Sequence, residues 1–369
     1  MLRPRILFYA VNGLGLGHVT RLLAIARKIR EQAPDAEIVF FTSSEAEDVV
    51  FREGFSAFKV PSRTLRLSSG LSPGTYSRML QTITLNLIAA FRPNLMVVDT
   101  FPAGAIQELL PVLRWGSRNI FVFRAQRPDA ANSLLMQNSL RLYHLVVVPH
   151  SSGEEVVPLP EGVDNIWTGP ILVRDRTEAI CRKEARRLLG LPMDRPTLYI
   201  TFGGGGDVDM ENSMQLAIQC LAGKETPLGK LHLAVARPPL YRGSVVPGPN
   251  VSPLEYYPMA ELYSAFDCAI SAAGYNSSME LLHHGVPTAF LPSPRQVDDQ
   301  EARANRIAKA EAGLCLLERT RETLQSTVDR LLDPSVAVKL SSNARAMVPD
   351  SGAERAAAAI LGLLPYEGV

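Results

Sequence analysis

The sequence has few cysteines, and their pattern is not that of a metal site. The 369 residues include four, Cys181, Cys220, Cys268 and Cys315, which lie far apart with no CxxC pair and no Cys/His pair at metal-ligand spacing. Scattered single cysteines are typical of a reduced cytoplasmic protein and not of a disulfide-rich or zinc-binding domain. We therefore expect free, mostly buried thiols.

The sequence also has no large net charge and no long apolar run. The formal net charge of +1 gives no overall attraction to nucleic acid or to an anionic membrane. No apolar run approaches the ~20 residues that span a bilayer, and the N-terminus passes directly into a strand-like segment with no signal-peptide pattern. With 46 % hydrophobic and 20 % charged residues, we expect a cytoplasmic globular protein that binds no nucleic acid.

What the sequence does contain is a repeated order of short apolar run, turn and amphipathic helix. Strands are predicted at 6–11, 37–42, the end of 51–60, 95–99, 120–123 and 145–148, and then at 197–202, 231–236, 268–271 and 288–291. Alternating strands and helices indicate a parallel sheet covered on both faces. Because each half begins with a strand, a glycine-rich loop and a helix, the prediction is an α/β fold of two Rossmann-like, doubly wound domains that face each other across a crevice.

The domain boundaries follow from the place where this order weakens. Residues 151–173 hold several prolines and glycines and are interpreted as the inter-domain region. We predict a first domain at 1–165, a second at 166–349, and a closing helix within 350–369 that packs back on the first domain. Residues 62–75, rich in Arg, Ser and Gly, are predicted to form a loop, and 178–189 a helix.

The first glycine loop lies between a strand and a helix. Gly13, Gly15 and Gly17 allow close approach of the backbone to a ligand, and a helix N-terminus favours an anion. A dinucleotide site would need GxGxxG and an acidic residue about 20 positions later. Here His18 occupies the last glycine position, and the second strand ends at 41–44 without a carboxylate. The pattern therefore disfavours a nicotinamide cofactor.

Two residues at predicted carboxyl ends of strands are candidates for acid–base chemistry. His18 follows the glycine loop, and histidine titrates near neutrality, so it can act as a general base. Asp99 ends the strand at 95–99. Each has a simpler interpretation: His18 could only hydrogen-bond the backbone at the helix start, and Asp99 could only cap a helix.

The strongest signal is the run from Ser271 to Leu282, where a strand ends, small residues turn the chain and a helix begins. The first-turn amides around 275–277 can hold a diphosphate through their N–H groups and the helix dipole. Glu280 lies in the next turn, where its carboxylate can accept both hydroxyls of a ribose. Asp299 and Gln300 stand at the next loop-to-helix junction and suit sugar hydroxyls. Together these features predict a nucleotide-sugar site.

The segment 271–305 resembles the donor-binding region of glycosyltransferase family 28, which includes the lipid-linked N-acetylglucosaminyltransferase of bacterial peptidoglycan synthesis. Shorter stretches that resemble the same family lie at 12–18, 168–174, 202–206, 255–267 and 350–355. The resemblance spans nearly the whole chain but is tight only in the second half, and 60–140 matches nothing in the family. It implies the GT-B architecture, with acceptor in the first domain and nucleotide in the second.

The resemblance also implies roles for individual residues. Those that it places at the donor nucleotide are Arg174, Gly204, Gly205, Tyr257, Met259, Gly274, Tyr275, Asn276 and Glu280, with Glu280 on the ribose and Arg174 near the phosphate charge. Asp299 and Gln300 would hold the donor sugar. Gly13, Gly15, Gly17 and His18 would face the acceptor. Asp299-Gln300 stands where the family has paired glutamines, which leaves N-acetylglucosamine open as the donor sugar.

The predicted function is an inverting, metal-independent transfer of a sugar from a nucleoside diphosphate to an acceptor hydroxyl. UDP is favoured and dTDP is not excluded; the acceptor, whether lipid-linked, glycan or small molecule, is unknown. No cofactor or metal is expected, because the helix start replaces a cation, and Asp207-Val208-Asp209 is interpreted as a helix cap. A nucleotide-sugar hydrolase or epimerase, and a non-catalytic sugar-nucleotide binding protein, are the alternatives.

A basic and apolar stretch in the first half raises the question of membrane contact. Arg63, Arg66 and Arg78 alternate with apolar residues that include Leu67 and Met79. Such a stretch could contact an anionic surface and a lipid-linked acceptor at the inner face of the membrane. The alternative is an ordinary solvated loop.

Overall fold

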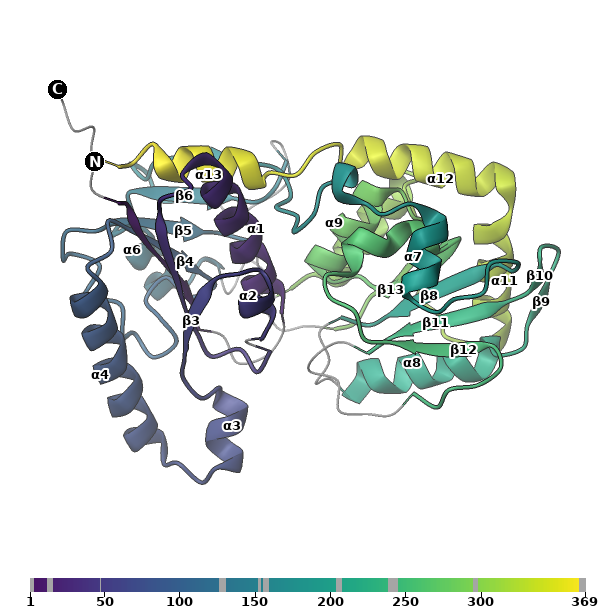
Figure 1. The fold of residues 1–369 in the computed structure, drawn as a ribbon, viewed down its shortest axis with the longest axis horizontal. Coiled ribbons are helices and arrows are strands. Elements are labelled where there is room, and N and C mark those ends of the chain that lie inside the picture. The colour runs from purple at the N-terminus through teal and green to yellow at the C-terminus, as the bar shows by residue number, and fades with distance from the viewer. Residues whose placement is uncertain are drawn as a thin grey trace. The chain divides into compact units, whose positions relative to one another are not determined.

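The computed structural model describes residues 3–11, 16–46, 48–125, 131–151, 154, 159–203, 208–237, 245–294 and 298–364. The chain forms two compact units (Figure 1). Unit 1 comprises Met1–Ile171 with Ser351–Val369, and unit 2 comprises Leu172–Asp350. The sequence-based divisions after 165 and 349 lie six residues and one residue before these.

Unit 1 is built on a seven-stranded parallel sheet. Its strands are β1 (Arg5–Ala10), β2 (Glu37–Thr42), β3 (Ser56–Lys59), β4 (Leu95–Asp99), β5 (Arg118–Val122), β6 (Leu145–Val148) and β7 (Asn165–Trp167), in the order β3-β2-β1-β4-β5-β6-β7. All five residues of β4 are buried. Strands buried on both faces are continuous apolar runs, which is why these runs predicted a parallel sheet.

Helices cover both faces of this sheet. They are α1 (Gly17–Gln32), α2 (Asp48–Arg52), α3 (Arg63–Ser68), α4 (Pro73–Phe91), α6 (Leu134–Leu140) and α13 (Ala353–Leu361). Side chains alternate along β1: Leu7 and Tyr9 pack in one cluster with residues of α4 and α6. On the other face Phe8 stacks on Phe40.

The C-terminal helix α13 belongs to unit 1 and packs against α1 (Figure 1). Two contacts hold its start: Gly352 N–H donates to the Pro170 carbonyl at 2.6 Å, and Arg355 Nε donates to the Thr168 carbonyl at 2.9 Å. A Cβ at position 352 would lie 2.6 Å from the Thr168 oxygen, so this approach requires glycine.

Unit 2 contains a six-stranded parallel sheet in the order β12-β11-β8-β13-β14-β15. The strands are β8 (Thr197–Thr201), β11 (His232–Ala236), β12 (Val251–Leu254), β13 (Cys268–Ala272), β14 (Thr288–Leu291) and β15 (Leu314–Cys315), with a hairpin of β9 (Glu225–Thr226) and β10 (Gly229–Lys230). The helices are η1 (Arg176–Glu178), α7 (Arg182–Leu188), α8 (Val208–Leu221), η2 (Met259–Ala265), α9 (Tyr275–His284), α10 (Gln300–Lys309), α11 (Arg321–Leu332) and α12 (Pro334–Met347).

The two sheets share one topology. Numbered along the chain within each parallel sheet, the order of the first six strands is 3-2-1-4-5-6 in both, which confirms the predicted pair of doubly wound domains. The strand order reverses between β1 and β4 in unit 1, and between β8 and β13 in unit 2. In such sheets ligands bind beyond the carboxyl ends of the strands at this reversal, so these two positions are where a site is expected.

Two local predictions are wrong. Residues 62–75 are not one loop but contain α3 and the start of α4. Each helix begins at a serine whose side chain accepts an amide hydrogen bond, Ser62 from Leu65 N at 3.0 Å and Ser72 from Thr75 N at 3.1 Å. Serine caps and loop serines look alike in composition, and Pro73 at the first turn was the available signal.

Within the region predicted to be inter-domain, 165–167 form β7, which pairs with β6, and the division between the two units falls after Ile171. The helix predicted at 178–189 begins only at Arg182. Before it, η1 is closed by a capping box between Asp175 and Glu178, so Glu178 ends a separate turn.

Candidate active site

The two acid–base candidates meet at the reversal point of the unit 1 sheet. His18 lies in the first turn of α1, directly after β1, and Asp99 is the last residue of the neighbouring strand β4. His18 Nδ1 and Asp99 Oδ1 are 3.2 Å apart. Of the glycines predicted to precede His18, Gly17 begins α1, while Gly13 and Gly15 lie outside the described residues.

Asp99 is held by an arginine that the sequence analysis missed. Arg21 Nε donates to Asp99 Oδ2 at 2.9 Å, and Arg21 Nη2 to Asp99 Oδ1 at 3.1 Å; both side chains are 1 % exposed. Burial by itself raises the pKa of Asp99, but the charges of Arg21 and His18 outweigh it and hold that pKa below its usual range. Asp99 is therefore an ionised anchor whose oxygens are already occupied.

His18 remains partly accessible, with 18 % of its side chain exposed. Its Nδ1 lies 3.1 Å from Arg21 Nη2 and 2.5 Å from the Thr100 hydroxyl. Burial lowers the pKa of His18, although Asp99 acts in the opposite direction, so the imidazole is neutral at pH 7 and able to accept a proton. Its Nε2 makes no hydrogen bond to the residues that the structure describes.

Of the two missed residues in this cluster, Arg21 could have been found. It lies three positions after His18 and so on the same helix face, among buried apolar residues of α1. Thr100 gave no signal beyond following a strand.

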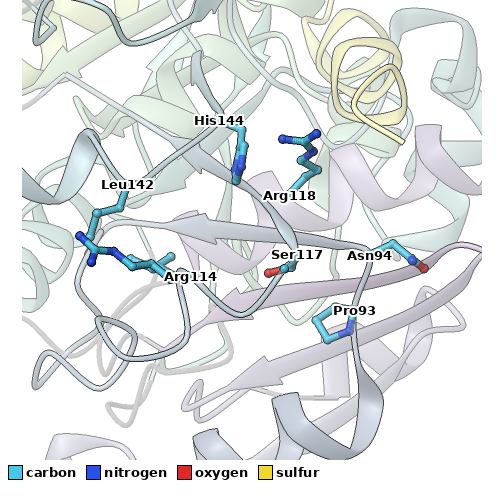
Figure 2. A pocket seen from close by; sticks show the side chains of 9 residues that line it. Pro93, Asn94, Arg114, Ser117, Arg118, Leu142 and His144 are labelled. Carbon is cyan, nitrogen blue, oxygen red and sulfur yellow. The ribbon is translucent and has the colours of Figure 1, made fainter. Parts of the chain in front are cut away.

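A hollow in unit 1 lies away from these residues (Figure 2). It measures about 550 Å³ and is lined by Asn94, Arg114, Arg118 and His144 among others. Asn94 precedes β4, Arg118 begins β5 and His144 precedes β6, so the hollow opens at the amino ends of the strands. His18 and Asp99 lie at the carboxyl ends, and no part of the site falls in this hollow.

In unit 2 the start of α9 has the predicted form. β13 ends at Ala272, Gly274 is the N-cap and Tyr275 and Asn276 open the helix. No side chain among the described residues caps this end, and a Cβ at Gly274 would meet nothing within 4 Å. A helix start of this form favours an anion beside it, through the N–H groups of its first turn and the helix dipole.

Glu280 lies one turn further along α9. Among the described residues its carboxylate accepts one hydrogen bond, from the Tyr263 hydroxyl at 3.4 Å. Burial raises the pKa of Glu280 to about 7, while Tyr263 and the charge of Arg174 lower it in part. A half-buried carboxylate with a single weak donor is suited to accept a pair of hydroxyls from a ligand.

Two of the residues predicted at the donor nucleotide lie at the start of η2 or just before it. Met259, 9 % exposed, begins this helix, and Tyr257 precedes it across a cis bond to Pro258. Arg174 donates from Nε to Glu261 Oε1 at 2.5 Å and from Nη1 to the Val173 carbonyl at 3.0 Å. The structure thus pairs Arg174 with a carboxylate of η2. Gly204, Gly205 and Asp207 lie outside the described residues.

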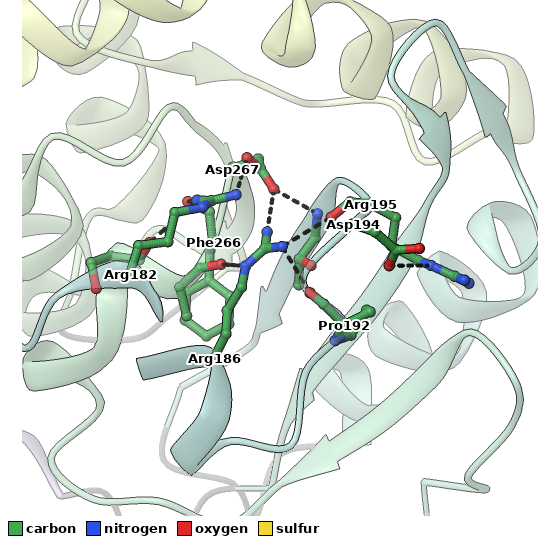
Figure 3. Close-up of polar contacts among 10 residues, drawn as sticks. Arg182, Arg186, Pro192, Asp194, Arg195, Phe266 and Asp267 are labelled. Carbon is green, nitrogen blue, oxygen red and sulfur yellow. Dashed lines mark hydrogen bonds and ion pairs between the residues drawn. The ribbon is translucent and has the colours of Figure 1, made fainter. Parts of the chain in front are cut away.

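A buried arginine fixes the far end of η2 (Figure 3). Arg186 of α7 donates from Nε to the Ala265 carbonyl at 2.9 Å and from Nη2 to Asp267 Oδ2 at 2.8 Å. Its Nη1 donates to the carbonyls of Pro192 and Arg195. This network positions the helix that carries Met259 and Tyr263 without taking part in the site.

Asp299 and Gln300 begin α10, as predicted, but they differ in burial. Asp299 is exposed, and its Oδ1 accepts from Ala302 N at 3.0 Å as the helix cap. Gln300 is 6 % exposed and accepts from Ser293 N at 3.1 Å. Arg303, which the sequence analysis missed, donates to the Ala273 carbonyl at 2.6 Å and to Asp298 at 2.7 Å. It links this segment to the turn before α9.

Three further observations concern only the described part of the chain. All four cysteines are free. No group of three His, Cys, Asp or Glu residues there is placed to hold a metal ion. None of the described helices combines the length and apolar character needed to cross a membrane.

Comparison with known proteins agrees with the predicted family. The glycosyltransferase family 28 C-terminal domain matches residues 211–358. The UDP-N-acetylglucosamine–N-acetylmuramyl-(pentapeptide) pyrophosphoryl-undecaprenol N-acetylglucosamine transferase of Nocardioides sp. is 30 % identical over 373 residues, covering 94 % of this chain and 95 % of that one. The same enzyme of Desulforudis audaxviator is 27 % identical over 330 residues and 84 % of each chain.

Solved structures extend the agreement to the fold. Acinetobacter baumannii MurG superposes with a TM-score of 0.62 at 16 % identity, covering 97 % of this chain and 100 % of that one. The glycotransferase of kitacinnamycin gives a TM-score of 0.68 at 16 % identity, covering 99 % and 100 %. The GT-B architecture and the family resemblance are thereby confirmed: the chain belongs to glycosyltransferase family 28 and is a glycosyltransferase enzyme.

Proposed function

We propose that this glycosyltransferase takes its sugar from a UDP-linked donor held by unit 2. The observation that carries the proposal is Glu280, a half-buried carboxylate with one weak donor among the described residues, one turn behind the start of α9. Ribose hydroxyls would supply the missing donors, and the α9 amides would hold the diphosphate. The curated relatives are named for a UDP-linked donor, which favours UDP over dTDP.

In the proposed reaction His18 of unit 1 removes the proton of the acceptor hydroxyl. The hydroxyl oxygen attacks the anomeric carbon while the bond to the diphosphate breaks, and this single displacement inverts the anomeric centre. Negative charge grows on the leaving diphosphate, where the α9 amides stabilise it without a metal ion. Asp99 stabilises the imidazolium that forms. Its own oxygens accept from Arg21, which makes His18 the better base.

Calorimetry of UDP, dTDP, GDP and NAD without added metal tests the donor site. UDP binds the wild type, and Glu280→Ala weakens it by roughly 10–100-fold, because hydrogen bonds to a charged group contribute about 1.5–3 kcal/mol. Glu225→Ala, which removes an exposed carboxylate of the β9 hairpin, is the matched control and leaves the affinity unchanged. Binding that ignores Glu280, or no diphosphate binding, would refute the donor site.

The donor sugar and the acceptor are proposed from the relatives' name: N-acetylglucosamine passing to a pyrophosphoryl-undecaprenol-linked acceptor. Because Asp299-Gln300 stands where the family has paired glutamines, the donor sugar is tested separately from the acceptor. Transfer assays with UDP-N-acetylglucosamine, UDP-glucose and UDP-galactose on a lipid-linked and a water-soluble acceptor decide both. Sugar released without any acceptor would instead show a hydrolase, and UDP binding without turnover would show a binding protein.

An enzyme that acts on a lipid-linked acceptor needs a surface that contacts the membrane. We propose that α3 and α4 form this surface, at the inner face of the membrane. Leu67, Met79 and Ile83 are 64 %, 47 % and 40 % exposed, and Arg63 and Arg78 are exposed beside them. Apolar side chains among arginines favour an anionic bilayer. Met79→Asp would reduce sedimentation with phosphatidylglycerol vesicles, whereas Val338→Asp, at an exposed site of unit 2, would not. Equal binding by both variants would refute this surface.

A further inference from the structure

Thr100, directly after β4, has a backbone conformation that its side chain disfavours. Its φ is +80°, in the left-handed region that β-branched residues rarely adopt. The other non-glycine residues with positive φ in the described chain are Arg92, Gln107 and Glu311, none of them β-branched. Strain of this kind persists where the surrounding structure imposes it, and it is enriched at active sites.

This backbone places the Thr100 hydroxyl beside both acid–base residues. Its Oγ1 lies 2.5 Å from His18 Nδ1 and 3.4 Å from Asp99 Oδ1. An ionised carboxylate only accepts, whereas a hydroxyl both donates and accepts. A chain in which Nδ1–H donates to Thr100 and the Thr100 hydroxyl donates to Asp99 satisfies all three groups.

The competing arrangement has a different chemical outcome. Arg21 Nη2 lies 3.1 Å from His18 Nδ1, and a hydrogen bond from this donor would leave the histidine proton on Nε2. With Nε2 protonated, the neutral ring could not accept a proton at its exposed side. Because Nη2 is also 2.8 Å from Asp99 Oδ2, the arginine can donate there while the hydroxyl takes Nδ1–H.

We propose that Thr100 is a positioning residue whose strained backbone holds its hydroxyl against His18, so that the proton stays on Nδ1 and Nε2 is free to accept one. The inference rests on the proposed role of His18 as the base. The function of the hydroxyl, which selects one of the two tautomers of His18, explains the strained backbone at this position.

The hydroxyl is tested by Thr100→Ala and Thr100→Ser. In Thr100→Ala, kcat falls by roughly tenfold or more, since a wrongly protonated base loses most of its contribution, while KM for UDP-N-acetylglucosamine is unchanged. Thr100→Ser restores kcat to within about threefold, as a hydroxyl at the same position should. Loss of kcat in both variants alike, or in neither, would overturn the inference.

The strain is tested separately with glycine. Thr100→Gly and Thr100→Ala both lack the hydroxyl, so the difference between their Tm values reports the Cβ alone; the glycine variant should melt about 2–4 °C higher. Gln107→Gly and Gln107→Ala, at φ +66° on an exposed site, should show a similar gap with unchanged kcat. A glycine variant that melts lower than the alanine variant at position 100 would contradict an imposed backbone.

Nitrogen-15 NMR of histidine-labelled protein separates this inference from the proposed function, because it needs no substrate. The His18 signal, assigned by its loss in His18→Ala, should show a protonated Nδ1 in the wild type and in Thr100→Ser, and a shifted or mixed tautomer in Thr100→Ala. An unchanged tautomer in Thr100→Ala refutes the role of Thr100. A changed tautomer with unchanged kcat leaves Thr100 in place and refutes His18 as the base.

Discussion

Each unit contains a buried arginine paired with an aspartate, and the two pairs have different surroundings. Arg21 with Asp99 in unit 1 and Arg186 with Asp267 in unit 2 have guanidinium-bearing side chains only 1 % and 2 % exposed. Arg186 donates also to three backbone carbonyls, and Asp267 accepts also from Thr197 N. Each of these additional hydrogen bonds is made with a backbone group near the amino ends of the strands.

The Arg21–Asp99 pair in unit 1 instead contacts a titratable side chain. His18 contacts both members of the pair, lies at the carboxyl ends of the strands and is 18 % exposed. A buried ion pair is therefore not in itself a sign of a functional site. The distinguishing feature is whether the pair makes its other hydrogen bonds only with backbone groups or also with a titratable group that is exposed to solvent.

Removing either arginine should give the largest effects and should separate the two pairs. Arg21→Met leaves the buried Asp99 without its guanidinium, and Arg186→Met leaves Asp267 with only the surface Arg182 and three backbone carbonyls without their donor. Each variant should reduce the free energy of unfolding by about 3–5 kcal/mol. Only Arg21→Met should also reduce kcat of the folded enzyme, by roughly 100-fold, because the His18 contacts are lost. Both tryptophans, Trp115 and Trp167, lie in unit 1, so their fluorescence in urea follows that unit, and hydrogen exchange follows unit 2.

The opposite result would reverse the assignment of the two pairs. In that case Arg186→Met would lose turnover as it loses stability, and Arg21→Met would keep full turnover.

Glu280 sharpens the contrast through the pH dependence of UDP binding. The pKa of Glu280 is raised to about 7, above its unfolded value, so the group takes up a proton on folding between these values and stability falls as pH rises through that window. Ribose hydroxyls bind the ionised form. UDP affinity should therefore rise roughly tenfold from pH 6 to pH 8, and Glu280→Gln should flatten the profile. A flat wild-type profile by calorimetry would contradict ribose binding at Glu280.

The smallest expected effect comes from Arg182, which pairs with the same Asp267 but from the surface, with 46 % of its side chain exposed. Surface pairs contribute about 0–1 kcal/mol. Arg182→Met should lower the urea midpoint only slightly beside Arg186→Met. If Arg182→Met lowered the urea midpoint as much as Arg186→Met, the network would depend on the charge pairing of Asp267 and not on the burial of Arg186.

The sequence predicted the parts of the site that depend on order along the chain. β4 and β14 were predicted with their observed ends because each is an apolar run closed by polar or turn residues. His18 and Asp99 were expected at strand ends, and the parallel sheet brings such ends together. Glu280 followed from its spacing after the turn into α9.

What the sequence could not show depends on partners distant in the chain. Arg186 on a helix surface is read as solvated, and its burial depends on carbonyls at 192, 195 and 265. The role of Thr100 depends on a φ value that no residue pattern predicts. The strand β7, with three residues, is defined by its pairing with β6 and not by its own composition.

The central claim is that the base and the donor site belong to different units, and His18→Ala tests it most directly. UDP binding by calorimetry and transfer from UDP-N-acetylglucosamine to the lipid-linked acceptor are measured on the same preparation. The prediction is unchanged UDP affinity with kcat reduced by roughly 10²–10⁴-fold. Transfer that proceeds at the wild-type rate in His18→Ala would contradict it.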